Sequence, residues 1–261
     1  MIDLHSHILP GIDDGPADLD AAVALAAAAV EGGVRTIAAT PHLRPDHPRV
    51  RPTELAGRVG ALRDALESAG VDLDVVSGGE LDVEYGLAAD DRLLRLVTLG
   101  GNGLDLLVEA PYGQAPPQLD AQLFELQLRG YRVLLAHPER NPTFLRDPAR
   151  LTALVERGIL LQVTAFALAQ GAAGSRSGRF ALDLVREGVA HVIASDIHAA
   201  SGSRGPALRD GFEAAAQVAP ERAAWMVGAA PAAILAGEPL PPPPAASRRR
   251  ARRGWRRSAG R

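Results

Sequence analysis

Short runs of aliphatic and β-branched residues alternate along this 261-residue chain with longer segments of helical periodicity. This alternation is typical of a parallel sheet whose neighbouring strands are joined by helices. Because the runs are short and almost wholly apolar, each strand is expected to be buried on both faces. The chain is therefore restricted to an α/β architecture, either a closed barrel or an open doubly wound sheet. The predicted strands are residues 2–5, 36–40, 74–78, 105–109, 131–136, 159–164 and 191–195.

Helices are predicted between and after these strands. The first, residues 18–31, has Asp18 as its N-cap and ends before a Gly-Gly pair, and the second, residues 53–69, ends before Gly70. Strands and helices together fit a single domain, since barrels of about 250 residues commonly form one unit. The remaining predicted helices are residues 88–97, 118–129, 148–157, 178–187, 206–217 and 220–235.

Histidines and carboxylates stand where most of the predicted strands end. A side chain at the C-terminal end of a barrel strand points into the site, whereas one at the opposite end supports stability. An open sheet would gather its ligands at one switch point, but these residues are spread over at least six strand ends. We therefore expect a distorted, closed (β/α)7 barrel with a metal site at one end. The candidate ligands are His5, His7, His42, Glu80, Glu109, His137, Asp196 and His198.

Two pairs of candidate ligands have the spacing of residues on one face of a strand. His5 and His7 are two apart on the first strand, and Asp196 and His198 repeat this spacing after the last. In a closed barrel the first and last strands are neighbours, so the four side chains are expected to converge. Imidazoles and carboxylates without thiolates suit Mn, Fe or Zn, and bridging carboxylates permit about two or three ions.

Three further carboxylates extend this site. Glu80 is the expected bridging ligand, because it ends a strand that lies between the two histidine groups. Pro10 and Gly11 turn the chain so that Asp13 and Asp14 can fold back over the first strand end. One of these aspartates can ligate a metal, whereas the other can cap the following helix. The residues alone leave open which aspartate does which.

The segment His-Pro-Glu-Arg, residues 137–140, places a cation next to a candidate ligand. The guanidinium of Arg140 matches phosphate oxygens as a planar fork, although an ordinary salt bridge is the alternative. Beside metal ions it implies a phosphorylated substrate, and Arg204 is a second candidate for binding it. His47, in a loop rich in proline and arginine, and His191, at the wrong end of its strand, are not expected to be ligands.

Composition excludes several kinds of enzyme and location. The chain has no cysteine, and all 28 of its basic residues are arginine. Cysteine-nucleophile phosphatases, thiolate metal sites, lysine Schiff bases and P-loops are therefore excluded, and no Gly-x-Ser-x-Gly elbow is present. No apolar run reaches the roughly 18 residues of a membrane span. The first residues form a strand with candidate ligands and not a signal peptide, so a cytoplasmic location is expected.

The arginines are distributed unevenly. Residues 1–238, the predicted barrel, carry 20 arginines against 31 acids, whereas residues 239–261 hold eight arginines and no acid. This last segment joins a proline run to an arginine run, which cannot bury a core, and it is predicted to be a disordered tail. An acidic body makes nucleic acid an unlikely partner, although a basic tail can contact polyanions.

The motifs HSHILPGIDDG, ATPH, a glycine-flanked Glu80, VEAP, AHPER and SDIH occur in this order. In this they resemble the polymerase-and-histidinol-phosphatase (PHP) superfamily, and most closely its bacterial tyrosine-protein phosphatases associated with capsule and exopolysaccharide. The resemblance extends from residue 1 to about residue 237. It implies a distorted (β/α)7 barrel and a multinuclear, typically Mn-dependent site. Two motifs depart from the pattern of these proteins. VEAP stands where phenylalanine more often precedes the proline, and SDIHA lacks the usual residue pair after the aspartate.

Carried over by position, the resemblance assigns the ligands to three ions. It also implies that Arg140 binds phosphate and takes part in catalysis, and that Arg204 is a second phosphate-binding arginine. The implied groups are His5, His7, Glu80 and Asp196 for one ion, Glu80, Glu109 and His137 for a second, and Asp14, His42 and His198 for a third.

The expected function is that of a Mn-dependent phosphomonoesterase acting on phosphotyrosine in protein. Metal ions would lower the pKa of a bound water, and the resulting hydroxide would attack phosphorus in line. The resemblance alone implies that the substrate is a bacterial tyrosine kinase that controls polysaccharide synthesis. The alternatives are a phosphatase for small phosphoesters such as histidinol phosphate, a nuclease tethered by the tail, and a catalytically silent metal-binding module. A homo-oligomer is also left open.

Overall fold

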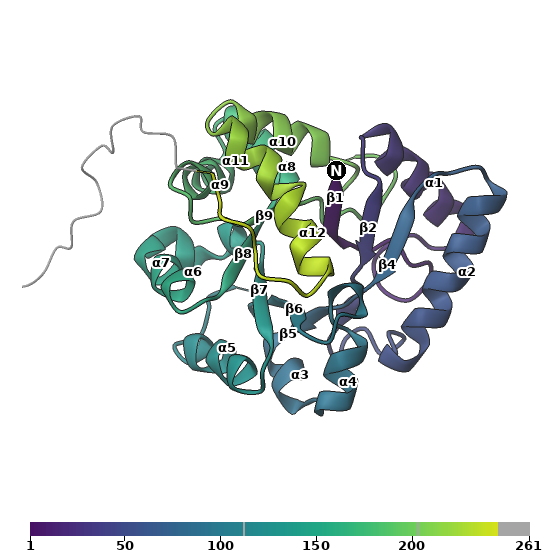
Figure 1. Ribbon diagram of the computed structural model, residues 1–261, viewed down its shortest axis with the longest axis horizontal. Helices are drawn as coiled ribbons and strands as arrows, with labels where there is room; N and C mark the ends of the chain where they lie inside the picture. The colour runs from purple at the N-terminus through teal and green to yellow at the C-terminus, as the bar shows by residue number, and fades with distance from the viewer. Residues whose placement is uncertain (112, 203, 245–261) are drawn as a thin grey trace, which may run out of the picture.

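A ring of parallel strands surrounded by helices forms the body of the protein (Figure 1). The computed structural model describes residues 1–111, 113–202 and 204–244. The strands follow one another around the ring in seven segments, as the alternation in the sequence predicts, and two of these segments are each divided into two strands. The strands are β1 (Ile2–Ser6), β2 (Thr36–Ala39), β3 (His42–Leu43), β4 (Asp74–Ser77), β5 (Glu80–Asp82), β6 (Asp105–Glu109), β7 (Arg132–Ala136), β8 (Leu160–Thr164) and β9 (Val192–Ala194).

Two of the seven predicted strands are interrupted in the structure. The run 36–40 continues beyond a break at Pro41 as β3, and the run 74–78 continues beyond Gly78-Gly79 as β5. Proline has no amide hydrogen to donate to a sheet, and a Cβ at Gly79 would overlap the side chain of Leu43. As a result the ring consists of two parallel sheets, with strand orders β1-β2-β4 and β3-β5-β6-β7-β8-β9.

The expectation of one closed sheet is wrong, because the described residues show no regular pairing between β1 and β9. Among the described residues these strands share a single bridge, Ser6 with Ile197, and no continuous ladder. Backbone hydrogen bonds from Asp196 N to His5 O and from His7 N to Ile197 O, both 2.9 Å, hold the seam between the two strands at its C-terminal end. The first and last strands are therefore neighbours, as predicted, but the barrel is not closed by regular pairing.

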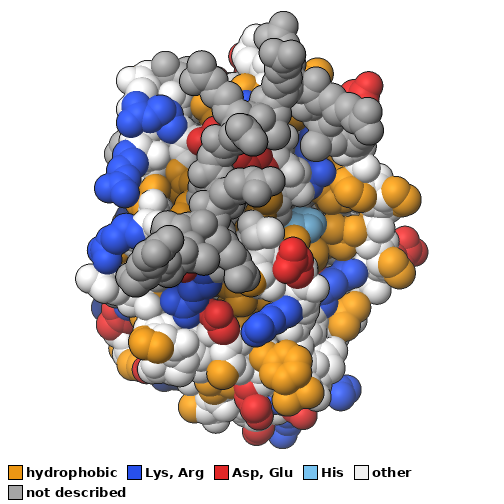
Figure 2. Space-filling view, turned by 90° about the vertical axis from the view of Figure 1, so that its left-hand side faces the viewer, with side chains coloured by type: hydrophobic (Ala, Val, Ile, Leu, Met, Phe, Trp, Pro, Cys, Tyr) orange, Lys and Arg blue, Asp and Glu red, His pale blue; other side chains and the backbone are white. Residues whose placement is uncertain are grey.

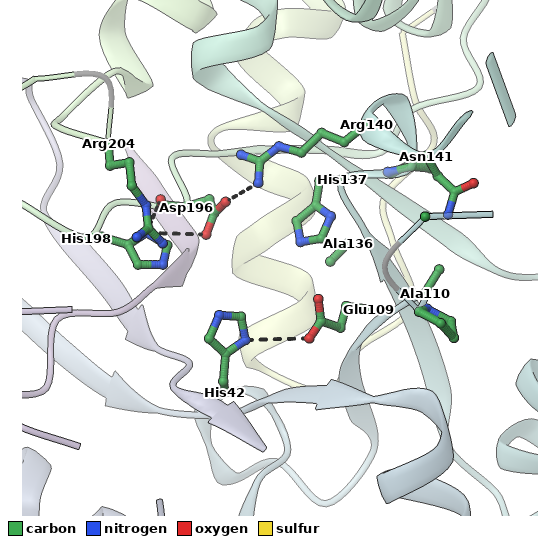
Figure 3. A pocket seen from close by; sticks show the side chains of 13 residues that line it. His42, Glu109, Ala110, Ala136, His137, Arg140, Asn141, Asp196, His198 and Arg204 are labelled. Carbon is green, nitrogen blue, oxygen red and sulfur yellow. Dashed lines mark hydrogen bonds and ion pairs between the residues drawn. The ribbon is translucent and has the colours of Figure 1, made fainter. Parts of the chain in front are cut away.

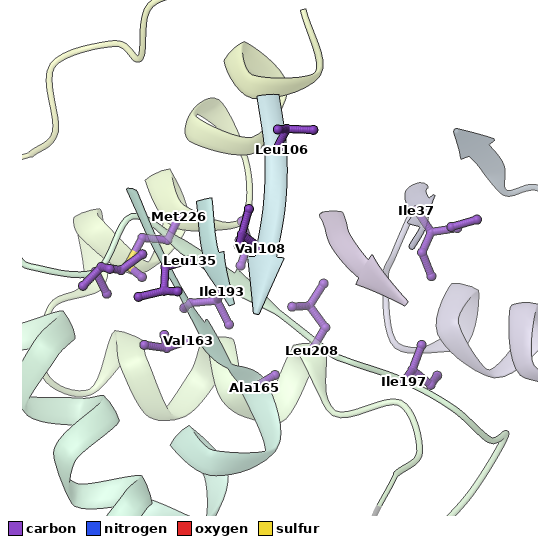
Figure 4. Close-up of a cluster of buried hydrophobic side chains, with 14 of the residues drawn as sticks. Ile37, Leu106, Val108, Leu135, Val163, Ala165, Ile193, Ile197, Leu208 and Met226 are labelled. Atoms are coloured by element: carbon purple, nitrogen blue, oxygen red, sulfur yellow. The ribbon is translucent and has the colours of Figure 1, made fainter. Parts of the chain in front are cut away.

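Alternate side chains of the strands face two hydrophobic clusters. Outward-facing residues such as Val108, Leu135 and Ile193 pack against the helices, including Leu208 and Met226 (Figure 4). Inward-facing residues fill the barrel and are covered at one end by the last helix. This inner cluster consists of Leu4, Ala38, Leu99, Leu107, Leu134, Ala136, Val192, Ala194 and Ile234.

Six of the predicted helices agree with the structure, and the others differ. Asp18 caps the first helix as expected, accepting from Ala21 N at 2.9 Å. The predicted helix 88–97 is shorter in the structure and corresponds to α4, and 220–235 breaks at Val227-Gly228. Three helices, α3, α6 and α8, were not predicted from the sequence. The α-helices are α1 (Leu19–Glu31), α2 (Leu55–Ser68), α3 (Val83–Ala88), α4 (Asp91–Leu96), α5 (Leu119–Leu128), α6 (Pro142–Arg146), α7 (Pro148–Glu156), α8 (Ala165–Ala172), α9 (Arg176–Arg186), α10 (Leu208–Ala216), α11 (Pro220–Met226) and α12 (Ala229–Leu235), and 3-10 turns occur at η1 (Pro52–Glu54), η2 (Leu99–Gly101) and η3 (Pro138–Arg140).

The beginning of the predicted tail packs on the body. Leu240 contacts both hydrophobic clusters, and Trp225 Nε1 donates to Pro241 O at 3.2 Å. The rest of the predicted tail, from residue 245, lies outside the described residues. In the described part of the chain no helix is long and apolar enough to cross a bilayer. On the visible surface in Figure 2, arginines are interspersed with acidic and hydrophobic side chains.

Candidate metal centre

The predicted ligands gather at the end of the barrel where the strands finish. The interruptions in the sheet place His42 and Glu80 there, because β3 and β5 begin with these residues. Their nitrogen and oxygen atoms form four overlapping groups, and within each group the atoms lie within 4.8 Å of one another. The groups are His5, His7 and Glu80; His5, His137 and Asp196; His42, Glu80 and Glu109; and His7, Asp14, His42 and His198.

The innermost atoms have the spacing of ligands around one ion. His5 Nε2 lies 3.3 Å from both Glu80 Oε2 and Asp196 Oδ1, and His7 Nε2 lies 3.4 and 3.3 Å from the same oxygens. The two Nε2 atoms are 3.4 Å apart. Ligands bound tetrahedrally at about 2.1 Å would be separated by about 3.4 Å. The structure therefore brings together the four residues that the resemblance assigns to one ion, with Glu80 and Asp196 in two different groups that share His5.

Hydrogen bonds to the Nδ1 atoms of two imidazole rings orient these rings so that their Nε2 atoms face the cluster of candidate ligands. His5 Nδ1 lies 3.0 Å from Gln162 Oε1 of β8, and His198 Nδ1 lies 2.8 Å from the carbonyl oxygen of Asp196. Metal-binding histidines are commonly oriented in this way, by donation from the other ring nitrogen. Gln162 is completely buried and was missed in the sequence, although it is the one polar residue in its strand before Thr164.

Asp13 takes a role that neither sequence alternative described. Its Oδ2 lies 2.7 Å from His7 Nδ1 and accepts from the backbone N of His42 at 3.2 Å. It does not cap the following helix, because Asp18 does so. Asp13 therefore supports two candidate ligands from behind, and its neighbour Asp14 faces the metal centre.

The two outer groups differ in part from those implied by the resemblance. His42 Nδ1 lies 2.8 Å from Glu80 Oε2 and 3.5 Å from Glu109 Oε1, so His42 joins these carboxylates. His137 instead groups with His5 and Asp196, while its Nε2 also lies 2.8 Å from Glu80 Oε1. Glu80 thus faces histidines with both oxygens, which is the geometry expected of a bridging ligand.

The third group lies nearest the solvent. Asp14 Oδ1 is 3.3 Å from His198 Nε2 and 3.6 Å from His42 Nε2, as the resemblance implies. The Asp14 side chain is 39% exposed, and Arg204 Nη2 holds its other oxygen at 2.8 Å. Because His42 faces Asp14 with one ring nitrogen and Glu80 with the other, it connects the outer group to the inner one.

Buried polar atoms in this cluster indicate that it suits metal ions. Glu80 Oε2, His42 Nδ1 and His198 Nε2 are buried and make no hydrogen bond of good geometry within the described residues, although each lies close to another candidate ligand. Such atoms are rare in native proteins and call for a ligand or another explanation. All three belong to a set of imidazole nitrogens and carboxylate oxygens that suits Mn, Fe or Zn. The residues present therefore fit a multinuclear metal site.

The electrostatic environment keeps the central carboxylates ionised. Burial opposes the charge of Glu80, but contacts with His5, His137 and His42 hold its pKa well below the ordinary value. Burial likewise opposes the charge of His42, yet the Glu109 and Glu80 carboxylates outweigh it and raise its pKa to about 9. Ionised carboxylates are the form that binds cations.

A cavity of about 210 Å³ opens beside the ligands (Figure 3). Arg140 Nη1 reaches its edge and lies 2.6 Å from Asp196 Oδ2. Burial lowers the pKa of Arg140, but Asp196 and Glu139 raise it above the ordinary value, so the guanidinium stays charged. The cavity is lined by His42, Glu109, Ala110, Pro111, Gly113, Ala136, His137, Pro138, Arg140, Asn141, Asp196, His198 and Arg204.

Arg44, which was not predicted from the sequence as a site residue, contacts one of the residues that line this cavity. Arg44 Nη1 donates to Glu109 Oε1 at 3.0 Å, and its Nε donates to Asp46 at 2.6 Å. Its position two residues after His42 was the available signal. His47 and His191 are in none of the four groups: the His47 ring stacks on His42 with centroids 5.0 Å apart.

Comparisons with known proteins identify the family of this chain. The family model described as "Capsular polysaccharide synthesis, CpsB/CapC" matches residues 1–235. The chain is 36% identical to the tyrosine-protein phosphatase YwqE of Bacillus subtilis (strain 168) over 76% of its length and 77% of that protein. It is 26% identical to the tyrosine-protein phosphatase CpsB of Streptococcus pneumoniae, over 82% and 88% of the two chains.

Solved structures show the same relationship. One from a study of YwqE from Bacillus subtilis and CpsB from Streptococcus pneumoniae, described as unique metal-dependent tyrosine phosphatases, superposes with a TM-score of 0.83. It is 31% identical and covers 93% of this chain and 98% of that one. A D-hydantoinase, at 14% identity and a TM-score of 0.51, shares the fold alone. The chain belongs to the CpsB/CapC family of capsular polysaccharide synthesis.

Proposed function

We propose that the protein is a metal-dependent protein-tyrosine phosphatase. The observation that carries the proposal is the cavity, because candidate metal ligands line it together with Arg140 and Arg204. Metal ions and guanidinium groups around one small cavity suit a phosphoryl group. The names of the relatives YwqE and CpsB support the same activity.

The nine clustered histidines and carboxylates would hold the ions, for which Mn is the expected metal and Fe or Zn the alternatives. When bound, two or three ions would lower the pKa of a water molecule and neutralise charge on the phosphoryl oxygens. Ligands of the first group are almost completely buried, so they are placed before substrate arrives. The ligand residues are His5, His7, Asp14, His42, Glu80, Glu109, His137, Asp196 and His198.

Arg140 is the protein group proposed to act on the phosphoryl oxygens. Its side chain lines the cavity and is 44% exposed, with one nitrogen fixed by Asp196 and the other N–H groups able to donate to a ligand. Charge spreads over the equatorial oxygens as the phosphoryl group transfers, and a fixed guanidinium stabilises that charge. Arg204, which also lines the cavity and is held by Asp14, would bind the same group.

The walls of the cavity suit an aromatic leaving group. Ala110, Pro111 and Pro138 line it with apolar surface beside the ligands, where a tyrosyl ring can lie. Phenolate, with a pKa of about 10, leaves more readily than the alkoxide of serine. Tyrosine phosphoesters therefore fit both the walls and the chemistry.

The physiological partner belongs to this proposal as well. A bacterial tyrosine kinase is the proposed phosphotyrosine protein, because the chain matches a family of capsular polysaccharide synthesis. A cytoplasmic location and a homo-oligomer stay predictions. Nucleic acid is disfavoured by the net acidity of residues 1–238, which repels polyanions.

The test is phosphate release by the purified full chain with added Mn, comparing a phosphotyrosine peptide, a phosphoserine peptide and histidinol phosphate. A chelator-treated sample provides the control. We expect chelator-sensitive release that prefers phosphotyrosine. Preference for histidinol phosphate would leave the proposed metal site in place but change the proposed substrate. If none of the three compounds releases phosphate in a metal-dependent way, the proposal is overturned.

A further inference from the structure

Strand β8 is the one strand in which the sequence indicated no functional residue. Yet its Gln162 and Thr164 are completely buried, and their spacing of two places them on the same face of the strand. Gln162 contacts His5, and its Oε1 accepts from the backbone N of His137 at 3.3 Å. Strand β8 therefore contributes support to the site, and Thr164 is the second such residue.

Thr164 holds the carboxylate of Glu139. Glu139 Oε1 accepts from Thr164 Oγ1 at 2.6 Å and from Thr164 N at 3.0 Å. Ser177 Oγ of α9 donates to the carbonyl oxygen of Glu139 at 2.8 Å. Glu139 is completely buried, so the turn that carries it is fixed to β8 through its side chain and to α9 through its backbone.

The same short turn carries two residues of the site. His137 precedes it and has a left-handed backbone, with φ of 33°, and Arg140 ends it. His137 Nε2 reaches Glu80 at 2.8 Å. Arg140 Nη1 reaches Asp196 at 2.6 Å, a contact drawn as a dashed line in Figure 3. Glu139 is completely buried and does not line the cavity, whereas His137 and Arg140 do, so Glu139 can anchor the turn between these two residues.

We propose that Glu139, anchored by Thr164, is a positioning residue that sets the placement of Arg140 for binding phosphoryl oxygens. The inference rests on the proposed function. A turn of three residues has few internal hydrogen bonds, so its position depends on such anchors. Displacing a substrate-binding group by about 1 Å can lower activity 100-fold, which makes an anchor next to Arg140 consequential.

The experiment compares Thr164→Val, which removes the hydroxyl donor, with Thr164→Ser, which keeps it. Glu139→Gln replaces the charged carboxylate by a neutral amide oxygen, which is a weaker acceptor for the two Thr164 donors. Val163→Ala is the matched control, because Val163 is on the same strand and faces the outer hydrophobic cluster. Each variant is assayed for kcat and KM on a phosphotyrosine peptide, for inhibition by inorganic phosphate, for bound metal and for Tm.

Thr164→Val and Glu139→Gln are expected to weaken phosphate inhibition and to lower kcat/KM between about 10- and 100-fold. Thr164→Ser should keep phosphate inhibition and kcat/KM close to their wild-type values. Val163→Ala should lower Tm without changing either of them. If the first two variants lower Tm but keep wild-type phosphate inhibition and kcat/KM, the anchor is structural only and the inference is wrong.

Failure of the proposed function is distinguishable from failure of this inference. If the wild-type protein releases no phosphate from any substrate, calorimetric binding of inorganic phosphate to the Mn-loaded protein replaces the kinetic readout. Wild-type binding that Thr164→Val and Glu139→Gln weaken still supports the anchor. Unchanged binding in both variants contradicts it, whatever the substrate is.

Discussion

At the scale of single residues, the strained positions of the backbone belong to the candidate site. His137 and Asp196, with φ of 33° and 55°, are the two non-glycine residues of positive φ in the described chain. Such conformations cost free energy unless the surroundings hold them. Each residue turns its side chain toward Glu80 or His5 just after a strand ends. Convergence of ligands from separate strands therefore depends on these two turns.

Loss of Arg140 tests the catalytic assignment. Arg140→Ala should lower kcat/KM by about 100- to 1000-fold, because a fixed cation at the phosphoryl oxygens is removed. Arg140→Lys should recover only a part, since an ammonium group cannot bind in the planar bidentate way. Steady-state kinetics on a phosphotyrosine peptide measure both, with Arg146→Ala, an exposed position on α6, as the control. Turnover near wild type in Arg140→Ala would remove this residue from the mechanism.

Asp13→Asn tests the support behind the ligands. The carboxylate faces His7 Nδ1 at 2.7 Å, and removing its charge should weaken metal binding about 10- to 100-fold. Mn titrations followed by calorimetry give the affinity. Asp18→Asn, nearby in the chain, preserves the helix N-cap and should bind Mn like the wild type. Equal affinities for the two variants would contradict the supporting role.

The ligands themselves could be predicted because strand ends and same-face spacing are visible in the residues. The supporting residues could not. Gln162, Glu139 and Arg44 act through side chains that are distant in sequence, and their partners become apparent only when β8, η3 and the loop after β3 are placed in space.

At the scale of elements, strands were predicted better than helices. Strand positions follow from apolar runs, whereas α8 begins directly after Thr164, which makes no side-chain cap, so no capping signal marks its start. Its close packing on α9 depends on glycine. A Cβ at Gly178 would overlap the backbone of Ala167 and Gly171, so this interface is specified by the absence of side chains, which periodicity does not reveal.

Gly178→Ala should therefore destabilise the protein by about 1–3 kcal/mol, as overpacking commonly does. Gly60→Ala in α2 is the matched control, because a Cβ there meets nothing within 4 Å. Gly60→Ala should stabilise the protein by about 0.5–1 kcal/mol, because alanine has a higher helix propensity than glycine. Urea unfolding measures both. A Gly178→Ala protein as stable as the wild type would show that α8 and α9 can separate without cost.

His191 is expected to make the junction of β8 and β9 sensitive to pH. Its Nδ1 accepts from Leu161 N at 3.2 Å, and burial, helped by Arg222, lowers its pKa to about 4. The unfolded chain takes up the proton below its ordinary pKa of about 6.5, so this contribution is complete above that pH and is lost as the pH falls toward 4.

At pH 5 the loss due to His191 should reach about 2 kcal/mol. Asn at this position offers an acceptor oxygen that does not titrate. The free energy of unfolding of His191→Asn should therefore fall less between pH 7.5 and pH 5 than that of the wild type. Parallel pH profiles for the two proteins would show that His191 does not carry this dependence.

At the scale of the whole molecule, the sequence predicted a single α/β domain with its site at one end of the barrel. It did not predict the division into two sheets or the seam between β1 and β9. Both arise from local breaks in pairing, which apolar runs conceal. The predicted boundary at residue 238 was also too early, because Leu240 packs on the body through contacts that a proline-rich sequence does not suggest.

Metal ions should stabilise the whole fold, because their ligands come from both sides of the seam. His5 and His7 belong to β1 and its end, while Asp196 and His198 follow β9. Mn at about 100 times its Kd should add about 2.7 kcal/mol to the stability. Thermal unfolding with chelator and with increasing Mn measures this, and a Tm that does not respond to Mn would contradict metal binding by the folded protein.

The placement of Leu240 has a practical consequence for handling the protein. Leu240 shares the inner cluster with Ile2 and Leu160, the first residues of β1 and β8. Ile2 and Leu240 therefore lie at the end of the barrel where the strands begin, opposite the strand ends that carry the candidate ligands. A surface tether or a fluorescent fusion attached before Ile2 would leave the cavity facing bulk solution, so the immobilised protein can be presented to large phosphorylated partners.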